Sequence, residues 1–139
     1  MATLIAADIF DPESELKLLD GKMDIIHTAL FLHLFSEDMC VKAVRRILKL
    51  FKDKVGVLFI GKQLGCVDSG MIANGGFRYN AESFKEMWER VSAEAGMEWK
   101  VECWLGEEDL YEMAAKTGIR AHFLLEGSRW LSFSVRRIK

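Results

Sequence analysis

Two short, almost continuously apolar runs restrict the possible folds of this chain more than any other feature. They span residues 23–32 and 55–61, and a segment with helical periodicity separates them. Both runs are too short to cross a membrane as a helix, and their continuous apolar character is typical of parallel strands covered on both faces. Two strands joined by a helix pair in parallel through a right-handed connection. The pattern therefore predicts an α/β fold.

The rest of the chain continues this alternation. Ser36 and Asn80 each stand at the N-cap position before an apolar stripe with helical spacing, and Pro12 suits a first helical position. Residues 62–80 are rich in glycine and small polar residues and are expected to form a long loop. The expected strands lie near residues 3–10, 23–32, 55–61, 98–105 and 122–138 (the last a strand or hairpin), and the expected helices near 12–19, 36–52, 81–95 and 107–118.

Length and charge limit the class of protein. The chain of 139 residues fits a single domain, and its formal net charge of −2 provides no basic surface for nucleic acid or an anionic membrane. The first residues lack the features of a signal peptide, so we expect a cytoplasmic protein. Cys40, Cys66 and Cys103 are far apart and form no C-x-x-C pair, which predicts reduced thiols and neither a disulfide framework nor a metal site.

The ends of the expected strands indicate where a ligand would bind. In open parallel sheets ligands bind beyond the carboxyl ends of the strands. His33, Lys62 and Gln63 follow two of the apolar runs, and Tyr79 stands just before a helix N-terminus, where donors can orient a carbonyl oxygen. These four are the candidate catalytic residues, although Lys62 could simply be solvated and Tyr79 could serve only in packing. The candidate substrate-binding residues are Leu30, Phe31, Leu34, Phe35, Met71 and Trp104.

His27 has a different expected role. It lies in the middle of the apolar run, so we expect a buried neutral histidine within a central strand. No serine, histidine and aspartate arrangement, fixed pair of carboxylates or phosphate-binding loop can be identified in the sequence.

Several segments, taken in order, resemble one known family. "ADIFDPESELKLLDGKMDIIHTALFLHLF", "VLFIGKQLG", "FRYNAESFKEMWERVSAEAGMEWKVE" and the terminal "LSFSVRR" together resemble the C-terminal half of class I S-adenosylmethionine methyltransferases of fungal polyketide and meroterpenoid pathways. The resemblance covers essentially the whole chain. It implies a truncated Rossmann-like sheet of about five strands with flanking helices, and it places the "FLHLF" segment near cofactor and substrate.

The resemblance also has a gap. In that family the cofactor lies on a glycine-rich loop after the first strand, and an acidic residue holds the ribose. This chain begins at what would be the third strand, so only Asp8, with Ile9 beside it, corresponds to a cofactor contact. We therefore expect no cofactor. The run at residues 23–32 would also lack its usual neighbouring strand, and the unpaired edge predicts a homodimer.

These observations support three hypotheses. The first is an enzyme of secondary metabolism that cyclises an apolar terpenoid or polyketide without S-adenosylmethionine, for example by an intramolecular Diels-Alder reaction, which needs only confinement and a hydrogen-bond donor. The second is a binding or dimerisation protein without catalytic activity. The third is a fragment of a true methyltransferase. The sequence does not identify the substrate.

Overall fold

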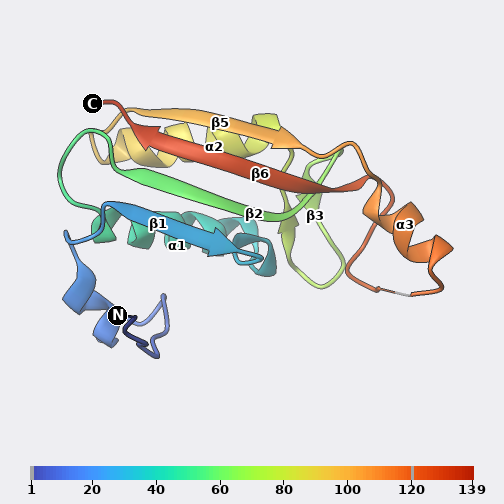
Figure 1. Cartoon of the computed structure of the whole chain (residues 1–139), viewed down its shortest axis with the longest axis horizontal. Coiled ribbons are helices and arrows are strands. Elements are labelled where there is room, and N and C mark those ends of the chain that lie inside the picture. Colours follow the sequence, from blue (N-terminus) through green and yellow to red (C-terminus); the bar gives the residue numbers. More distant parts are fainter. Residues whose placement is uncertain (1, 120) are drawn as a thin grey trace.

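The computed structural model describes residues 2–119 and 121–139. Four strands form one mixed sheet in the order β1-β2-β6-β5, and the helices α1 and α2 pack against one face of it (Figure 1). The α/β class expected from the sequence is confirmed. The strands are β1 (Ile25–Ala29), β2 (Leu58–Cys66), β5 (Trp99–Leu105) and β6 (Ser128–Arg137).

Only the first pair of strands is parallel. β1 pairs in parallel with β2, as expected for two strands joined by a helix, and Ile26 lies opposite Phe59. β6 runs antiparallel to both of its neighbours and is inserted between β2 and β5. The last strand of the chain therefore occupies a central position, while β1 lies at an edge.

Both long helices begin where the sequence predicts. α1 (Glu37–Leu50) follows Ser36, whose hydroxyl accepts a hydrogen bond from the Met39 N–H. α2 (Ala81–Glu94) follows Asn80, and Asn80 and Ser83 each bond the other's backbone N–H in a reciprocal capping box. These caps satisfy N–H groups that the first helical turn leaves without partners.

A stack of aromatic side chains fills the space between the sheet and the two helices. The ring centroids of Phe59 and Trp88 lie 4.8 Å apart, and those of Phe84 and Phe133 lie 4.7 Å apart. All four side chains are buried. Burial of such large side chains supplies much of the free energy that favours folding.

The N-terminal segment differs from the expectation. Residues 3–10 form no strand, and a short 3-10 helix, η1 (Glu15–Leu19), replaces the expected helix at residues 12–19. Asp8 and Asp11 accept hydrogen bonds from the backbone N–H groups of Phe10 and Glu13, two residues further along. Local bonds of this kind compete with pairing to a neighbouring strand. The prediction of a first strand here was wrong.

The expected long loop at residues 62–80 was also wrong for much of its length. β2 extends to Cys66 because β6 pairs with it as far as Ser128, and a small hairpin follows, formed by β3 (Gly70–Met71) and β4 (Phe77–Arg78). The glycine and polar content of the segment gave no sign of the short hairpin, or of the pairing of β2 with β6, a strand more than sixty residues away in the sequence.

Three further observations complete the fold. A single 3-10 turn, η2 (Leu32–Leu34), follows β1, and a short helix, α3 (Leu110–Lys116), lies at the far end of the sheet (Figure 1). Cys40, Cys66 and Cys103 are all free thiols. Within residues 2–119 and 121–139, no helix has the length and apolar character needed to cross a membrane.

Candidate functional site

The main cavity lies between the end of the sheet and α3, and we call it the α3 pocket. Its volume is about 830 Å³, within the usual range for small-molecule sites. The sheet side contributes Leu64 and Trp130, the turn after β1 contributes Leu30 and Leu34, and the α3 side contributes Leu110, Met113 and Phe123. Two basic side chains, His33 and Arg78, complete the set of residues that we use to define the pocket.

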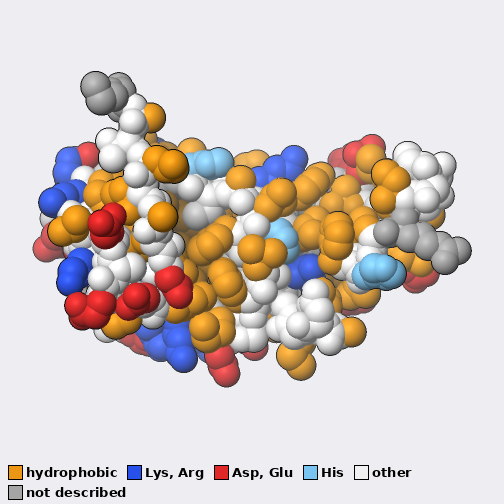
Figure 2. All heavy atoms as spheres, turned by 90° about the horizontal axis from the view of Figure 1, so that it is seen from below, with side chains coloured by type: hydrophobic (Ala, Val, Ile, Leu, Met, Phe, Trp, Pro, Cys, Tyr) orange, Lys and Arg blue, Asp and Glu red, His pale blue; other side chains and the backbone are white. Residues whose placement is uncertain are grey.

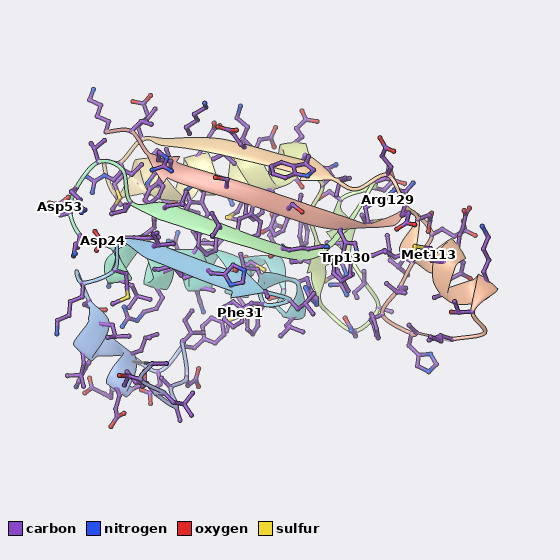
Figure 3. The ribbon with its side chains drawn as sticks, viewed as in Figure 1. Asp24, Phe31, Asp53, Met113, Arg129 and Trp130 are labelled. Atoms are coloured by element: carbon purple, nitrogen blue, oxygen red, sulfur yellow. The ribbon has the colours of Figure 1, made fainter. Side chains whose placement is uncertain are left out.

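The arrangement can be followed in two views. In Figure 3, Trp130 and Met113 lie at the same end of the molecule, from the sheet and from α3 respectively, whereas Phe31 lies beneath β1. Figure 2 shows hydrophobic side chains spread over the lower face, with a few basic and histidine side chains among them. Most of the residues that line the α3 pocket are apolar.

A left-handed backbone residue brings η2 into the pocket. Leu30 has a φ of 55°, and its N–H donates to the Lys62 carbonyl oxygen at the end of the parallel pairing. A non-glycine residue in this region is uncommon and costs on the order of 1 kcal/mol. The sharp turn that it makes places His33 and Leu34 beside the ends of β1 and β2.

His33 is held as a neutral imidazole. Its Nδ1 accepts a hydrogen bond from the Leu64 N–H at 3.3 Å, so the neutral ring carries its proton on Nε2. Burial, and then the positive charge of Arg78, lower the pKa of His33 from 6.5 to about 4. At neutral pH the side chain can donate one hydrogen bond to a ligand but carries no charge.

Arg78 lies behind the turn and fixes it. One of its terminal nitrogens donates to the His33 carbonyl oxygen at 2.6 Å, and the other donates to the Phe123 carbonyl oxygen at 3.5 Å. The side chain is almost completely buried, and this burial lowers the pKa of the guanidinium. Arg78 therefore links η2 to the segment after α3.

Asp109 anchors α3 to the sheet. Its carboxylate caps the helix by accepting from the Tyr111 and Glu112 N–H groups, and it also accepts from the Gly127 N–H at 2.9 Å. The guanidinium of Arg129, at the start of β6, lies 3.0 Å from the same carboxylate. Although desolvation raises the pKa of Asp109, these hydrogen bonds and Arg129 lower it overall, which keeps the anchor ionised at neutral pH.

The structure brings three of the sequence-predicted site residues together. Leu30, His33 and Leu34 all line the α3 pocket. Lys62 lies next to it, because its ammonium group is 4.6 Å from the centroid of the Trp130 ring. The roles proposed for these residues stay predictions.

The two other candidate catalytic residues lie in the interior. Gln63 and Tyr79 are almost fully buried and are not among the residues that line the α3 pocket. Burial raises the pKa of the Tyr79 hydroxyl, so the phenol stays protonated. Within residues 2–119 and 121–139, neither amide atom of Gln63 has a hydrogen-bond partner.

The remaining apolar candidates lie elsewhere. Phe31 and Phe35 line a second hollow of about 580 Å³, which we call the N-terminal hollow because residues 3–10 form its other wall. Met71 and Trp104 are 73% and 55% exposed and lie outside both cavities. His27 was expected in the interior, but this was wrong: its side chain is exposed on the edge strand β1.

Sequence reasoning missed several pocket residues. Arg78, Met113, Phe123 and Trp130 come from four separate segments of the chain, and Arg78 lies in the region expected to be an irregular loop. The spacing of the residues in the sequence gave no signal that they meet. Only the pairing of β6 with β2 and the docking of α3 bring them together.

The comparison with solved structures shows the class of the fold. Among solved structures the chain resembles class I methyltransferase folds: the [4+2]-cyclase SpnF has a TM-score of 0.60 at 13% identity, covering 94% of this chain and 55% of that protein. Phosphoethanolamine N-methyltransferase 2 of Haemonchus contortus has a TM-score of 0.54 at 11% identity, covering 86% and 34%. At such identities the likeness concerns the fold alone. The chain has a class I methyltransferase-like fold.

Curated proteins identify the relatives more closely. The chain is 36% identical over 144 residues to O-methyltransferase phiE of Fungal sp. (strain ATCC 74256), covering 99% of this chain and 48% of that protein. It is 35% identical to O-methyltransferase atr3 of Stereocaulon alpinum, with 99% and 39% covered, and 32% identical to methyltransferase adrK of Penicillium rubens, with 96% and 47% covered. No family model matches the chain. The chain is thus similar in sequence to fungal methyltransferases, as the resemblance in the sequence indicated, and it spans less than half the length of these three relatives.

The fold implies S-adenosylmethionine as a cofactor, and the residues of this chain fit it poorly. The N-terminal hollow contains one carboxylate, Asp8, which already accepts a hydrogen bond from the Phe10 N–H. Its other lining residues are mostly apolar, and none is a glycine. Such a donor set leaves the ribose and the methionine end of the cofactor without the contacts that they need. The described residues alone do not form a complete cofactor site.

Proposed function

We propose that the chain binds an apolar terpenoid or polyketide in the α3 pocket and catalyses its cyclisation without S-adenosylmethionine. One observation supports this most directly. An apolar pocket of about 830 Å³ contains a neutral histidine, His33, whose Nε2–H has no acceptor among the described residues. An apolar cavity that holds a hydrogen-bond donor suits a pericyclic ring closure.

The chemistry needs no group transfer. In an intramolecular [4+2] cycloaddition two carbon–carbon σ bonds form at the expense of two π bonds, no atom leaves, and no proton or electron is exchanged with the protein. Holding a flexible chain in its reactive shape can lower the barrier by up to about 7 to 11 kcal/mol in favourable intramolecular cases. The apolar walls of Leu64, Met113 and Trp130 would provide that restriction.

His33 would add an electrostatic contribution. A carbonyl conjugated with the dienophile gains negative charge on its oxygen as the bonds form, and a donor already in place stabilises that charge. The hydrogen bond from the Leu64 N–H to Nδ1 fixes both the tautomer and the orientation of the ring. His33 therefore needs little reorganisation to donate through Nε2.

The comparisons support the proposal through the shared fold and through the kind of relatives that the chain has. A protein named as a [4+2]-cyclase shares this fold, and the curated relatives are fungal methyltransferases. Such a fold therefore accommodates cyclisation in at least one solved case. The reaction and substrate of the present chain are our proposal.

A direct assay tests the function. The purified chain is incubated with an acyclic polyene precursor that bears a conjugated carbonyl, and product formation is compared with the reaction without protein. We expect faster product formation with the protein, and a loss of at least about tenfold in kcat for His33→Asn, which lacks Nε2 but keeps an acceptor near the position of Nδ1. His27→Asn is the matched control, because His27 is exposed on β1. Binding without any acceleration would instead indicate a binding protein.

The similarity to O-methyltransferases favours a second candidate, methyl transfer by a larger unit that includes a cofactor-binding part. Calorimetry separates the two. Titration of the purified chain with S-adenosylmethionine is expected to show no micromolar binding, since Asp8 is the only carboxylate among the described residues that line the N-terminal hollow. Micromolar binding, together with transfer of a labelled methyl group to an added phenol, would overturn the proposal of cyclisation without cofactor.

A further inference from the structure

A buried guanidinium holds the peptide group of His33. One terminal nitrogen of Arg78 donates to the His33 carbonyl oxygen at 2.6 Å, and the other donates to the Phe123 carbonyl oxygen at 3.5 Å. The Arg78 side chain is only 3% exposed. Because burial of a charge is unfavourable unless hydrogen bonds offset it, an arginine in this place needs a physical explanation.

The contact between Arg78 and His33 depends on a glycine. A Cβ atom at Gly76 would lie 3.0 Å from the His33 carbonyl oxygen and 3.2 Å from Nη1 of Arg78. Both distances are shorter than ordinary van der Waals contacts, so a side chain at this position would press on the donor and on its acceptor. The connection between β3 and β4 thus leaves room for this hydrogen bond.

Two further hydrogen bonds hold the same turn at its ends. The Cys40 thiol donates to the Leu32 carbonyl oxygen at 3.0 Å, and the Phe77 N–H donates to the Phe35 carbonyl oxygen at 2.8 Å. Arg78 holds the residue between these ends that carries the imidazole. Its hydrogen bond therefore has the most direct influence on where the His33 ring points.

The charge of Arg78 also acts on the ring. Nδ1 of His33 accepts from the Leu64 N–H, and a proton on Nδ1 would turn this acceptor into a second donor facing the first. An imidazolium could therefore not keep the present orientation of the ring. The guanidinium disfavours this proton, because its positive charge, after burial, is the second cause that lowers the pKa of His33 to about 4.

The other charged groups around the turn do not oppose this effect. No aspartate or glutamate is among the described residues that line the α3 pocket, and the lining residues from α3 and β6 are uncharged. Lys62 on β2 is a cation, like Arg78. Glu37, at the start of α1, raises the pKa of the Cys40 thiol but is not among the groups that shift the pKa of His33.

We propose that Arg78 is a positioning residue of the proposed cyclisation, which holds the His33 carbonyl oxygen and so keeps the Nε2–H of the neutral ring directed into the α3 pocket. The inference rests on the proposed function in taking His33 as the hydrogen-bond donor. Arg78 acts through His33 and not on the substrate. A donor that is fixed before the substrate binds needs little reorganisation during the reaction.

Nuclear magnetic resonance tests this hold without a substrate. The 15N chemical shifts of the ring nitrogens are followed against pH, and the signals of His33 are identified by their loss in His33→Asn. In the unchanged protein we expect one tautomer, with its proton on Nε2, and a titration midpoint near 4. In Arg78→Met we expect a mixture of tautomers and a midpoint that rises towards 6.5 by at least about 0.5. An unchanged tautomer and midpoint would overturn the inference.

Kinetics with the acyclic polyene precursor test the consequence for the reaction. In Arg78→Met we expect kcat at pH 7 to fall at least about tenfold, with KM changed less than about twofold because the apolar walls remain. We also expect kcat of this variant to fall more steeply between pH 7 and pH 5 than in the unchanged protein, since more of His33 becomes protonated. A purely structural role of Arg78 would not change the pH profile.

Arg136→Met is the matched control. Arg136 also donates to a backbone carbonyl oxygen, that of Gly56 at 3.0 Å, but it is exposed at the other end of β6 and does not line the α3 pocket. This variant is expected to keep kcat, the pH profile and the His33 titration of the unchanged protein. Equal effects of Arg78→Met and Arg136→Met would contradict a specific hold on His33.

Arg78→Lys separates the charge from the hydrogen bonds. An ammonium group keeps the positive charge but lacks the planar fork that reaches two carbonyl oxygens. We expect the His33 midpoint to stay near 4, while kcat falls about threefold. If Arg78→Met does not fold, this variant decides, because an unchanged kcat in Arg78→Lys would overturn the inference.

The outcomes separate this inference from the proposed function. If the precursor is cyclised and Arg78→Met changes neither the ring of His33 nor kcat, the inference fails while the proposed function stands. If Arg78→Met changes the tautomer and midpoint of His33 but the unchanged protein cyclises no precursor, the hold of Arg78 on His33 stands and the proposed function fails.

Discussion

His33 illustrates how one residue depends on its surroundings in the fold. In the sequence it is a histidine after an apolar run, and this alone leaves both its burial and its charge open. The turn at Leu30, the N–H of Leu64 and the guanidinium of Arg78 together make it a buried neutral donor. Its titration is therefore a measurable sign that the pocket is formed.

The pH dependence of stability tests the charge state of His33. Its pKa in the folded protein is about 4, below the 6.5 of a free histidine, so between these values the unfolded chain takes up a proton that the folded chain does not. Stability is therefore lost as the pH falls from 6.5 towards 4, by up to about 3 kcal/mol. The measurement is the free energy of unfolding in urea at pH 7 and at pH 4.5, for His33→Asn and for the unchanged protein. The decrease in this free energy between the two pH values is expected to be smaller in His33→Asn by about 2 to 3 kcal/mol.

The same measurement has an internal control. His27 is exposed, so His27→Asn is expected to keep the full loss of stability between the two pH values. An equal loss in His33→Asn and in the unchanged protein would show that His33 titrates normally and is not enclosed in the pocket.

At the scale of elements, the junction of β1 with β2 sets the position of the pocket. A Cβ atom at Gly61 would lie 2.2 Å from the Thr28 carbonyl oxygen and 2.6 Å from the ring of Phe133. Glycine is therefore required where β1 and β6 both approach β2. The same junction places Leu30 and Lys62 next to each other at the mouth of the pocket.

Substitution of Gly61 tests this close packing. Gly61→Ala is expected to destabilise the fold by about 2 kcal/mol or more, because the contacting carbonyl belongs to the backbone and cannot move independently. The measurement is the midpoint of urea unfolding. Gly70→Ala is the control, since no atom lies within 4 Å of a Cβ at that position, and it is expected to change stability by less than about 0.5 kcal/mol. Similar losses for both variants would refute the steric argument.

At the scale of the whole molecule, β1 forms one of the two edges of the four-stranded sheet, and β5 forms the other. Among the residues that the structure describes, β1 pairs only with β2, and Ile25 at its start is 60% exposed. Asp24 and Leu30 form backbone hydrogen bonds with β2. In a parallel pair, alternate residues of a strand direct their backbone groups to opposite sides. The N–H and C=O groups of Ile25, His27 and Ala29 therefore point away from β2. The sequence-based prediction of a homodimer concerns this edge.

Oligomeric state tests that prediction. We expect the purified chain to sediment as a dimer in analytical ultracentrifugation at micromolar concentrations, with two β1 edges paired. His27→Pro removes an outward N–H without breaking a bond to β2, so it is expected to yield monomers that keep the native circular dichroism spectrum. His27→Asn is expected to remain dimeric. A monomeric unchanged protein, or a His27→Pro variant that stays dimeric, would contradict pairing at this edge.

The sequence by itself determined the local features of this protein. Ser36 and Asn80 cap the helices where expected, and the apolar runs became β1 and part of β2, because caps and periodicity depend on neighbouring residues. The family resemblance correctly implied the class of fold. Of the candidate site residues, Leu30, His33 and Leu34 lie in the α3 pocket, and all three come from one short segment at a strand end.

Only the tertiary structure decided the rest. β6 enters the middle of the sheet, β1 is left with an exposed face, and Arg78, Met113 and Trp130 meet across the pocket although they are far apart in the chain. The physical reason is that strand order, burial and pairing of charges depend on contacts between distant segments. Local sequence preferences do not specify these contacts, because the same apolar or basic residue can be stable in several environments.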